Sequence, residues 1–163
     1  MKILKYMISI YLLIMFTSLG SLNAEQDDNA VIKANSKFYV ALNEMFKGNV
    51  EPMKEAWSHS DDVTYLPPTG GIKSGWKEVL SEWQAQADQK LGGTVKSENI
   101  RISMGKDIAV VVNYEKGSNV DSDGNHVEIS IRATNTFRKE NGKWKMIGHH
   151  TDLLPFLQKQ DSH

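Results

Sequence analysis

The clearest candidates for chemistry are two adjacent histidines, His149 and His150, near the end of the segment GKWKMIGHHTD. The segment reads as a β-strand, and successive side chains on a strand point to opposite faces of a sheet. Trp144 and Met146 belong on the apolar face, because Lys145 would otherwise be driven into it. Continuing this alternation, we expect His150 to face the interior and His149 to face outward.

An inward His150 could act as a general acid or base, because the unperturbed pKa of imidazole, about 6.5, lies near neutrality. Asn135 lies on the apolar face of the preceding strand and could donate a hydrogen bond to a developing oxyanion. Asp152 would fall on the His150 side, where it could orient the imidazole. The alternative is that His150 is a hydrogen-bonded wall residue with Asn135 as its partner. A one-residue bulge in the hairpin 140–142 would exchange the two histidines.

Other groups of polar residues give weaker predictions. The segment DSDGN (121–125) resembles the start of a calcium loop but lacks its third acidic position and its final glutamate, so we interpret it as a turn. His59, Asp61 and Asp62 are ligand-type residues between a helix and a strand, where such residues usually cap and turn. Arg132 could anchor a ligand carboxylate if the register slipped, but we favour a solvated or dimer-interface charge. We expect no metal and no other cofactor.

The elements that position these residues follow from the apolar periodicity. It predicts helices over 27–46, 52–57 and 75–90. It also predicts a short strand over 62–67 and four long strands joined by tight turns, over 94–104, 107–116, 126–139 and 143–151. The order α-α-β-α-β-β-β-β predicts an α+β domain with its helices on one face of a strongly curved antiparallel sheet.

The first 24 residues predict export. They combine two lysines, an apolar run over 7–16 and a final Ala24, the pattern of a secretory signal peptide. The run is shorter than the about 20 residues of a membrane span, so an uncleaved anchor is the less favoured alternative. Cleavage would leave one domain over 25–163, with 163 − 24 = 139 residues and a net charge of 17 − 20 = −3. The sequence has no cysteine, which excludes disulfides and thiolate metal sites and suits a bacterial periplasmic protein.

Three segments carry a family resemblance: FYVALNEMFKGN, AWSHSDDVTYLPPTGGIKSGWKEVLSEW and IRATNTFRKENGKWKMIGHHTD. In this order of elements the chain resembles the nuclear transport factor 2-like superfamily, in particular its SnoaL-like and domain-of-unknown-function branches. The resemblance implies a cone-shaped sheet wrapped around three helices, with a pocket at the wide end. Members include ketosteroid isomerases, dehydratases, polyketide cyclases, transport adaptors and a kinase association domain, so the fold leaves the function open.

The chain departs from the ketosteroid isomerases at three positions where that family has ionisable groups. The corresponding residues are Phe38, Pro67 and Asn135, so steroid isomerase chemistry is not expected. Tyr39 or Tyr65 could supply a phenol from nearby, although either could instead be a core aromatic. The predicted pocket-lining residues are Tyr39, Trp57, Tyr65, Trp83 and Met146.

The sequence therefore predicts a domain that binds a small, mostly apolar molecule, because the residues predicted to line the pocket include no paired acid and base. One alternative is a SnoaL-like lyase, isomerase or hydrolase that uses His150, and another is a homo-oligomeric interaction domain. We expect a homodimer packed through the outer face of the sheet. The interspersed charges show no basic stripe for nucleic acid, and they do not favour a membrane surface once the leader is removed.

Overall fold

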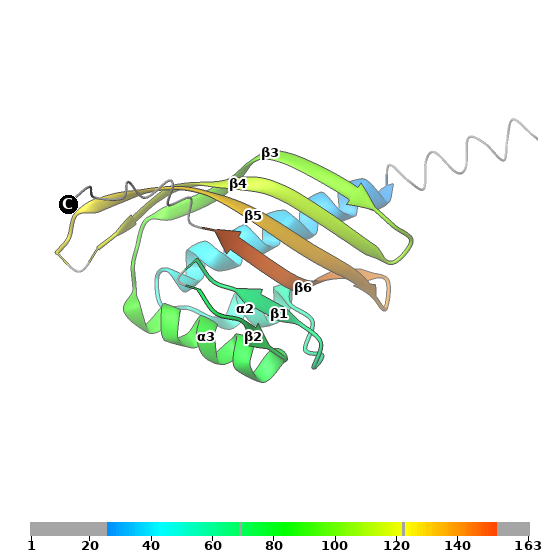
Figure 1. Ribbon diagram of the computed structural model, residues 1–163, viewed down its shortest axis with the longest axis horizontal. Helices are drawn as coiled ribbons and strands as arrows, with labels where there is room; N and C mark the ends of the chain where they lie inside the picture. The colour runs from blue at the N-terminus through cyan, green and yellow to red at the C-terminus, as the bar shows by residue number, and fades with distance from the viewer. Residues whose placement is uncertain (1–25, 69, 122, 153–163) are drawn as a thin grey trace, which may run out of the picture.

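The computed structural model describes residues 26–68, 70–121 and 123–152, with three helices and six strands (Figure 1). The helices are a first helix over 26–45, α2 (Glu51–Ala56) and α3 (Trp76–Gln89). The strands are β1 (Thr64–Leu66), β2 (Lys73–Ser74), β3 (Thr94–Met104), β4 (Ile108–Val120), β5 (His126–Glu140) and β6 (Lys143–Asp152). The predicted α+β class is confirmed, and the short strand β2 is an addition to the predicted order.

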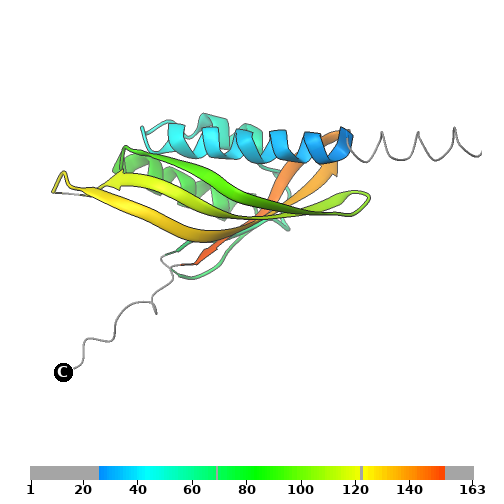
Figure 2. The ribbon, with the colours of Figure 1, turned by 90° about the horizontal axis from the view of Figure 1, so that it is seen from above.

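The strands form one open sheet in the order β2-β1-β6-β5-β4-β3. Strand β1 runs parallel to β6, and all other neighbours are antiparallel. The sheet is therefore mixed, and not wholly antiparallel as predicted, because the chain crosses from the β1–β2 edge of the sheet to β3 at the opposite edge before it returns. The helices lie along one face while the long strands curve beneath them (Figure 2).

The helices are formed by apolar residues that recur at helical spacing. In α3 the buried residues Val79, Trp83 and Ala87 lie four positions apart, so they occupy one face. The first helix gives way to a turn in which Gly48 has a φ of 95°, a conformation that glycine adopts without strain.

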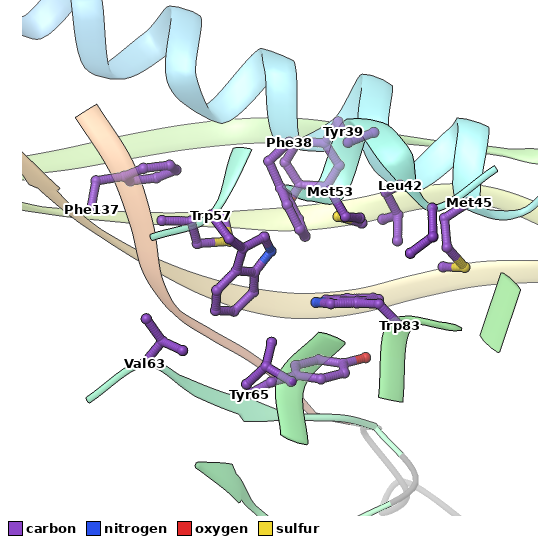
Figure 3. Close-up of a cluster of buried hydrophobic side chains, with 14 of the residues drawn as sticks. Phe38, Tyr39, Leu42, Met45, Met53, Trp57, Val63, Tyr65, Trp83 and Phe137 are labelled. Carbon is purple, nitrogen blue, oxygen red and sulfur yellow. The ribbon is translucent and has the colours of Figure 1, made fainter. Parts of the chain in front are cut away.

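The core fills the space between the helices and the inner face of the sheet (Figure 3). Its largest side chains, each less than 2% exposed, include Phe38, Trp57, Trp83 and Phe137. Burying a large apolar side chain contributes roughly 1.5–3 kcal/mol. The fold is held by this packing, since the sequence has no cysteine for disulfides.

A β-bulge in β6 decides which histidine is inside. Phe137 pairs with Met146 and Thr136 pairs with Gly148, so Ile147 is an extra residue on β6. Trp144 and Met146 face the helices as predicted, but the extra residue shifts the alternation after Met146. The prediction that His150 faces the interior is therefore wrong, because His149 is buried and His150 is exposed. The bulge lies at residue 147 rather than in the hairpin at 140–142.

The predicted signal peptide over 1–24 lies outside the described residues. Within the described part of the chain, none of the helices has the length and apolar character that would let it span a membrane.

Candidate functional site

The inward histidine, His149, is enclosed by aromatic rings. Its imidazole centroid lies 4.7 Å from that of Phe38, 5.4 Å from that of Tyr65 and 6.0 Å from that of Trp83. Only 3% of His149 is exposed. Burial, assisted by the neighbouring His150, lowers its pKa from 6.5 to about 3, because the charged form loses its hydration. The imidazole is therefore neutral over the physiological range.

Asn135 faces His149 directly across the pairing of β5 with β6. It is fully buried on the inner face, as predicted, and its Oδ1 lies 2.6 Å from Nδ1 of His149. Its Nδ2 donates to Oδ1 of Asn35 at 2.7 Å and to the hydroxyl of Tyr39 at 3.3 Å. Its histidine partner is thus His149 rather than the predicted His150, and its amide is tied to the first helix.

A buried carboxyl, Glu115 on β4, completes the site. The Tyr39 hydroxyl donates to Oε1 of Glu115 at 3.1 Å, and Nε2 of His149 lies 3.6 Å from the same oxygen. Burial raises the pKa of Glu115 from 4.5 to about 7, and the Tyr39 hydrogen bond opposes this shift. An acid and a base therefore lie side by side, both with displaced pKa values, in an apolar environment.

Glu115 was missed from the sequence, although a signal was present. Ala109, Val111, Asn113 and Glu115 alternate along β4 and share its inner face. Applying to this strand the alternation used for β5 would have placed a carboxyl group inside the cone. A charged residue on an apolar face is rarely buried without a partner, so it marks a candidate site.

Tyr39 connects the first helix to this pair. Besides donating to Glu115, its hydroxyl accepts from Nδ2 of Asn113 at 2.7 Å. Burial and the nearby Glu115 charge hold the pKa of Tyr39 well above its usual range, so the phenol stays protonated. Tyr39 therefore serves as a fixed hydrogen-bond donor and acceptor behind the carboxyl group.

A cavity of about 300 Å³ opens over the acid–base pair. Glu115 on β4 and His149 and Thr151 on β6 line it. Tyr65 on β1 and Trp83 on α3 line it as well, and the stacked rings of these two side chains, which Figure 3 shows, lie 4.2 Å apart. Its apolar lining comprises mainly Leu42, Phe46, Pro67, Pro68, Leu91, Val95, Ile129 and Ile131. Nε1 of Trp83 and Oγ1 of Thr151 are buried and have no hydrogen-bond partner in the described part of the chain.

Of the five predicted lining residues, Tyr65 and Trp83 line this cavity. Tyr39, Trp57 and Met146 are buried, but they belong to the packed core and network beneath it. The bulge after Met146 explains why His149, rather than His150, lines this cavity.

Asp152 and Arg132 lie on the opposite, outer face of the sheet. Arg132 donates to both carboxylate oxygens of Asp152, which lowers the pKa of that acid. Asp152 does lie on the His150 side, but that side faces away from the cone, so Asp152 does not orient the buried imidazole. A separate outer hollow of about 700 Å³ is lined by these two residues together with His150, Val112 and Tyr114.

The remaining sequence candidates have structural roles. Nε2 of His59 lies 2.8 Å from the backbone oxygen of Lys54, and its ring stacks on Trp76 at 4.4 Å. Oδ1 of Asp121 accepts from the backbone amide of Asp123, two residues on, at 2.9 Å, as in an Asx turn. In the described ranges no group of three or more His, Cys, Asp or Glu side chains is arranged to hold a metal ion.

The comparison with known families agrees with this architecture. Residues 31–153 match the model of the SnoaL-like domain. The chain therefore belongs to the SnoaL-like family. Solved structures of NTF2-like proteins share its fold.

Two solved structures illustrate the shared fold. A candidate dehydratase of the NTF2-like family from Streptomyces avermitilis is 24% identical, with a TM-score of 0.69 over 78% of this chain and 97% of that chain. An NTF2-like superfamily protein from Salmonella enterica serovar Typhimurium is 15% identical, with a TM-score of 0.68 over 79% of this chain and 92% of that chain. At these identities the similarity establishes the fold alone.

A similarity to a plant protein covers part of that protein. The F-box protein SKIP8 of Arabidopsis thaliana is 26% identical over 125 residues, which is 77% of this chain. The chain spans 50% of the length of that relative.

Proposed function

We propose that this protein binds a small, largely apolar molecule in the cone cavity and transfers a proton to and from it with Glu115 and His149. The observation that carries the proposal is the buried carboxyl oxygen 3.6 Å from an imidazole nitrogen, beneath a cavity of about 300 Å³. This pairing replaces His150 as the centre of the enzyme hypothesis. It also removes the reason for preferring simple binding, which was the lack of a paired acid and base.

The raised pKa of Glu115 suits proton transfer near neutrality. A carboxyl group with a pKa of about 7 retains a proton part of the time at pH 7, and a neutral imidazole has a free lone pair. Two reaction classes fit such a pair: isomerisation through an enol, and elimination of water next to a carbonyl group. Both need one group that gives a proton to oxygen and another that takes a proton from carbon.

The lining indicates the chemical character of the ligand. Among the described residues that line the cavity, the acidic side chains are Glu82 and Glu115, and none is a lysine or an arginine. Glu82 is itself paired with Lys73 at 3.2 Å. A carboxylate or phosphate would therefore have no cation to meet within the described lining, which favours an uncharged ketone or alcohol.

The test uses a panel of cyclic ketones and β-hydroxyketones small enough for the cavity. Deuterium incorporation and water loss are followed by NMR in D2O with the wild type, Glu115→Gln, His149→Ala and the control His150→Ala. We expect the first two variants to lower turnover about 100-fold or more and His150→Ala to leave it unchanged. Ligand binding without exchange or dehydration in the wild type would refute catalysis and leave the binding role.

A second part of the proposal concerns self-association. Ile108, Val112 and Tyr114 follow one another along the outer face of β4, and each is about 40% exposed. A row of exposed apolar side chains in the middle of a sheet favours burial against another protein surface. We infer that two copies of the protein pack through this face.

A third part of the proposal concerns location. The first 24 residues have the pattern of a signal peptide, so we infer that the protein is exported to the periplasm after cleavage near Ala24.

A further inference from the structure

The polar side chains beneath the cavity form a closed ring of four residues. The ring runs from Glu115 to Tyr39 at 3.1 Å, then to Asn135 at 3.3 Å and to His149 at 2.6 Å, and it returns to Glu115 across 3.6 Å. In such a ring the role of one group constrains the role of the next, so the directions of the hydrogen bonds can be followed from the Asn113 amide, which bonds to a backbone oxygen.

Asn113 and Tyr114 fix the first direction. Nδ2 of Asn113 lies 3.1 Å from the backbone oxygen of Tyr114, which can only accept, and 2.7 Å from the Tyr39 hydroxyl. The Tyr39 oxygen therefore accepts a proton from Asn113. Its own single proton is left for Oε1 of Glu115, at 3.1 Å.

Asn135 carries this direction to the histidine. Its Nδ2 has two acceptors, the Tyr39 hydroxyl and Oδ1 of Asn35 at 2.7 Å. Its Oδ1 must then face Nδ1 of His149, and a carbonyl oxygen only accepts. The proton on the neutral imidazole consequently lies on Nδ1, which leaves the lone pair of Nε2 facing Glu115.

We infer that Asn35 and Tyr39 are positioning residues which, through Asn135, hold His149 in the Nδ1–H tautomer, so that Nε2 is the proton acceptor and the Glu115 carboxyl is the proton donor. This assignment rests on the proposed function. It gives the role of proton acceptor to His149 and the role of proton donor to Glu115. In a dehydration, Nε2 takes the proton from carbon while Glu115 protonates the departing hydroxyl to water. The imidazolium then returns its Nε2 proton to the Glu115 carboxylate, which restores the pair.

The location of Asn35 supports a role beyond packing. It lies fully buried on the core-facing side of the first helix, between Val31 and Phe38, where an apolar residue would be expected. Its Nδ2 has no hydrogen-bond partner in the described part of the chain. A buried amide whose donor has no partner is unfavourable. The favourable interaction of this side chain is therefore made by its acceptor, Oδ1, which accepts a hydrogen bond from Asn135.

The experiment reads the tautomer of His149 directly. Long-range 1H–15N correlation spectra of the full-length folded protein distinguish a protonated ring nitrogen from an unprotonated one, and His149→Ala assigns the signals. The wild type is compared with Asn35→Leu and Tyr39→Phe, which remove one acceptor each. Asn35→Asp keeps the acceptor. Asn43→Leu is the control, because Asn43 lies on the same helix but bonds to the backbone of Val95.

We expect an unprotonated Nε2 in the wild type, in Asn35→Asp and in Asn43→Leu. In Asn35→Leu and Tyr39→Phe the Nε2–H form should increase about fivefold relative to Nδ1–H, the factor that corresponds to ~1 kcal/mol for one neutral hydrogen bond. A protonated Nε2 in the wild type, or an unchanged tautomer ratio in both variants, would overturn the inference. Because this signal needs no substrate, its failure is distinguishable from an absence of turnover.

Discussion

Replacing Glu115 with glutamine should change how the stability of the protein depends on pH. The folded-state pKa of Glu115 is raised from 4.5 to about 7, so its contribution to stability is present below pH 4.5 and is lost as the pH rises through 7. The folded-state pKa of His149 is lowered from 6.5 to about 3, so its contribution is present above pH 6.5 and is lost as the pH falls toward 3.

The two contributions cancel between pH 4.5 and 6.5. In that window the folded pair holds one proton, whichever group carries it, and the unfolded chain also holds one, on the histidine. Replacement by glutamine removes the contribution of the carboxyl group and leaves that of the histidine. The free energy of unfolding of the variant then changes by about 1.4 kcal/mol per pH unit. Over 6.5 − 4.5 = 2 pH units, the free energy of unfolding of Glu115→Gln should fall relative to wild type by about 2 to 3 kcal/mol as the pH is lowered.

Urea unfolding at pH 4.5, 5.5, 6.5 and 7.5, followed by tryptophan fluorescence, measures this difference. Glu128→Gln is the matched control, because Glu128 is exposed on β5. Subtracting the wild-type free energy of unfolding at each pH removes the contributions of the titratable groups that both proteins share. If Glu115→Gln and wild type differ by a constant amount at all four pH values, the buried pair does not hold a single shared proton and the acid–base assignment fails.

Three further predictions concern other parts of the molecule. A Cβ at Gly117 would lie 1.9 Å from the carbonyl oxygen of Thr94, so Gly117→Ala should lower the urea-measured stability by ~3 kcal/mol or more. Gly124→Ala meets no atom within 4 Å, and its positive φ of 84° should cost only ~1 kcal/mol. Val112→Asp should convert the proposed dimer to a monomer in light scattering, and an unchanged mass would exclude that interface. Mass spectrometry of the exported protein should find a chain that begins at residue 25, whereas an intact leader would show that cleavage after Ala24 does not occur.

Much of the architecture could be predicted from periodicity. The helical spacing of Val79, Trp83 and Ala87 and the alternation of Ala133, Asn135 and Phe137 each indicated the correct buried face. These patterns repeat several times within one element, so one atypical residue does not reverse them. The short strand β2 has only two residues, which is too few to produce a pattern.

The orientation of the histidines could not be predicted in this way, because it depends on one residue. The alternation in β6 is correct up to Met146 and reversed after it, since Ile147 has no counterpart on β5. A signal was nevertheless present in Gly148, because an isolated glycine inside a strand is typical of a bulge. Glu115 was missed for a different reason, since the alternation that places it on the inner face of β4 was not applied to that strand. Its pairing with Tyr39 and His149 could not be read from the sequence, because they come from elements far away along the chain.

The bulge at Ile147 also gives a rule of parity for related chains. In a regular strand, two residues share a face of the sheet when an even number of positions separates them. Trp144 and His149 are five positions apart, an odd number, and yet both are buried on the inner face. A relative in which this interval is even should need no inserted residue to bring the same two side chains together. Counting the interval between the last core tryptophan and the histidine would therefore distinguish homologues that retain the irregularity from those that have lost it.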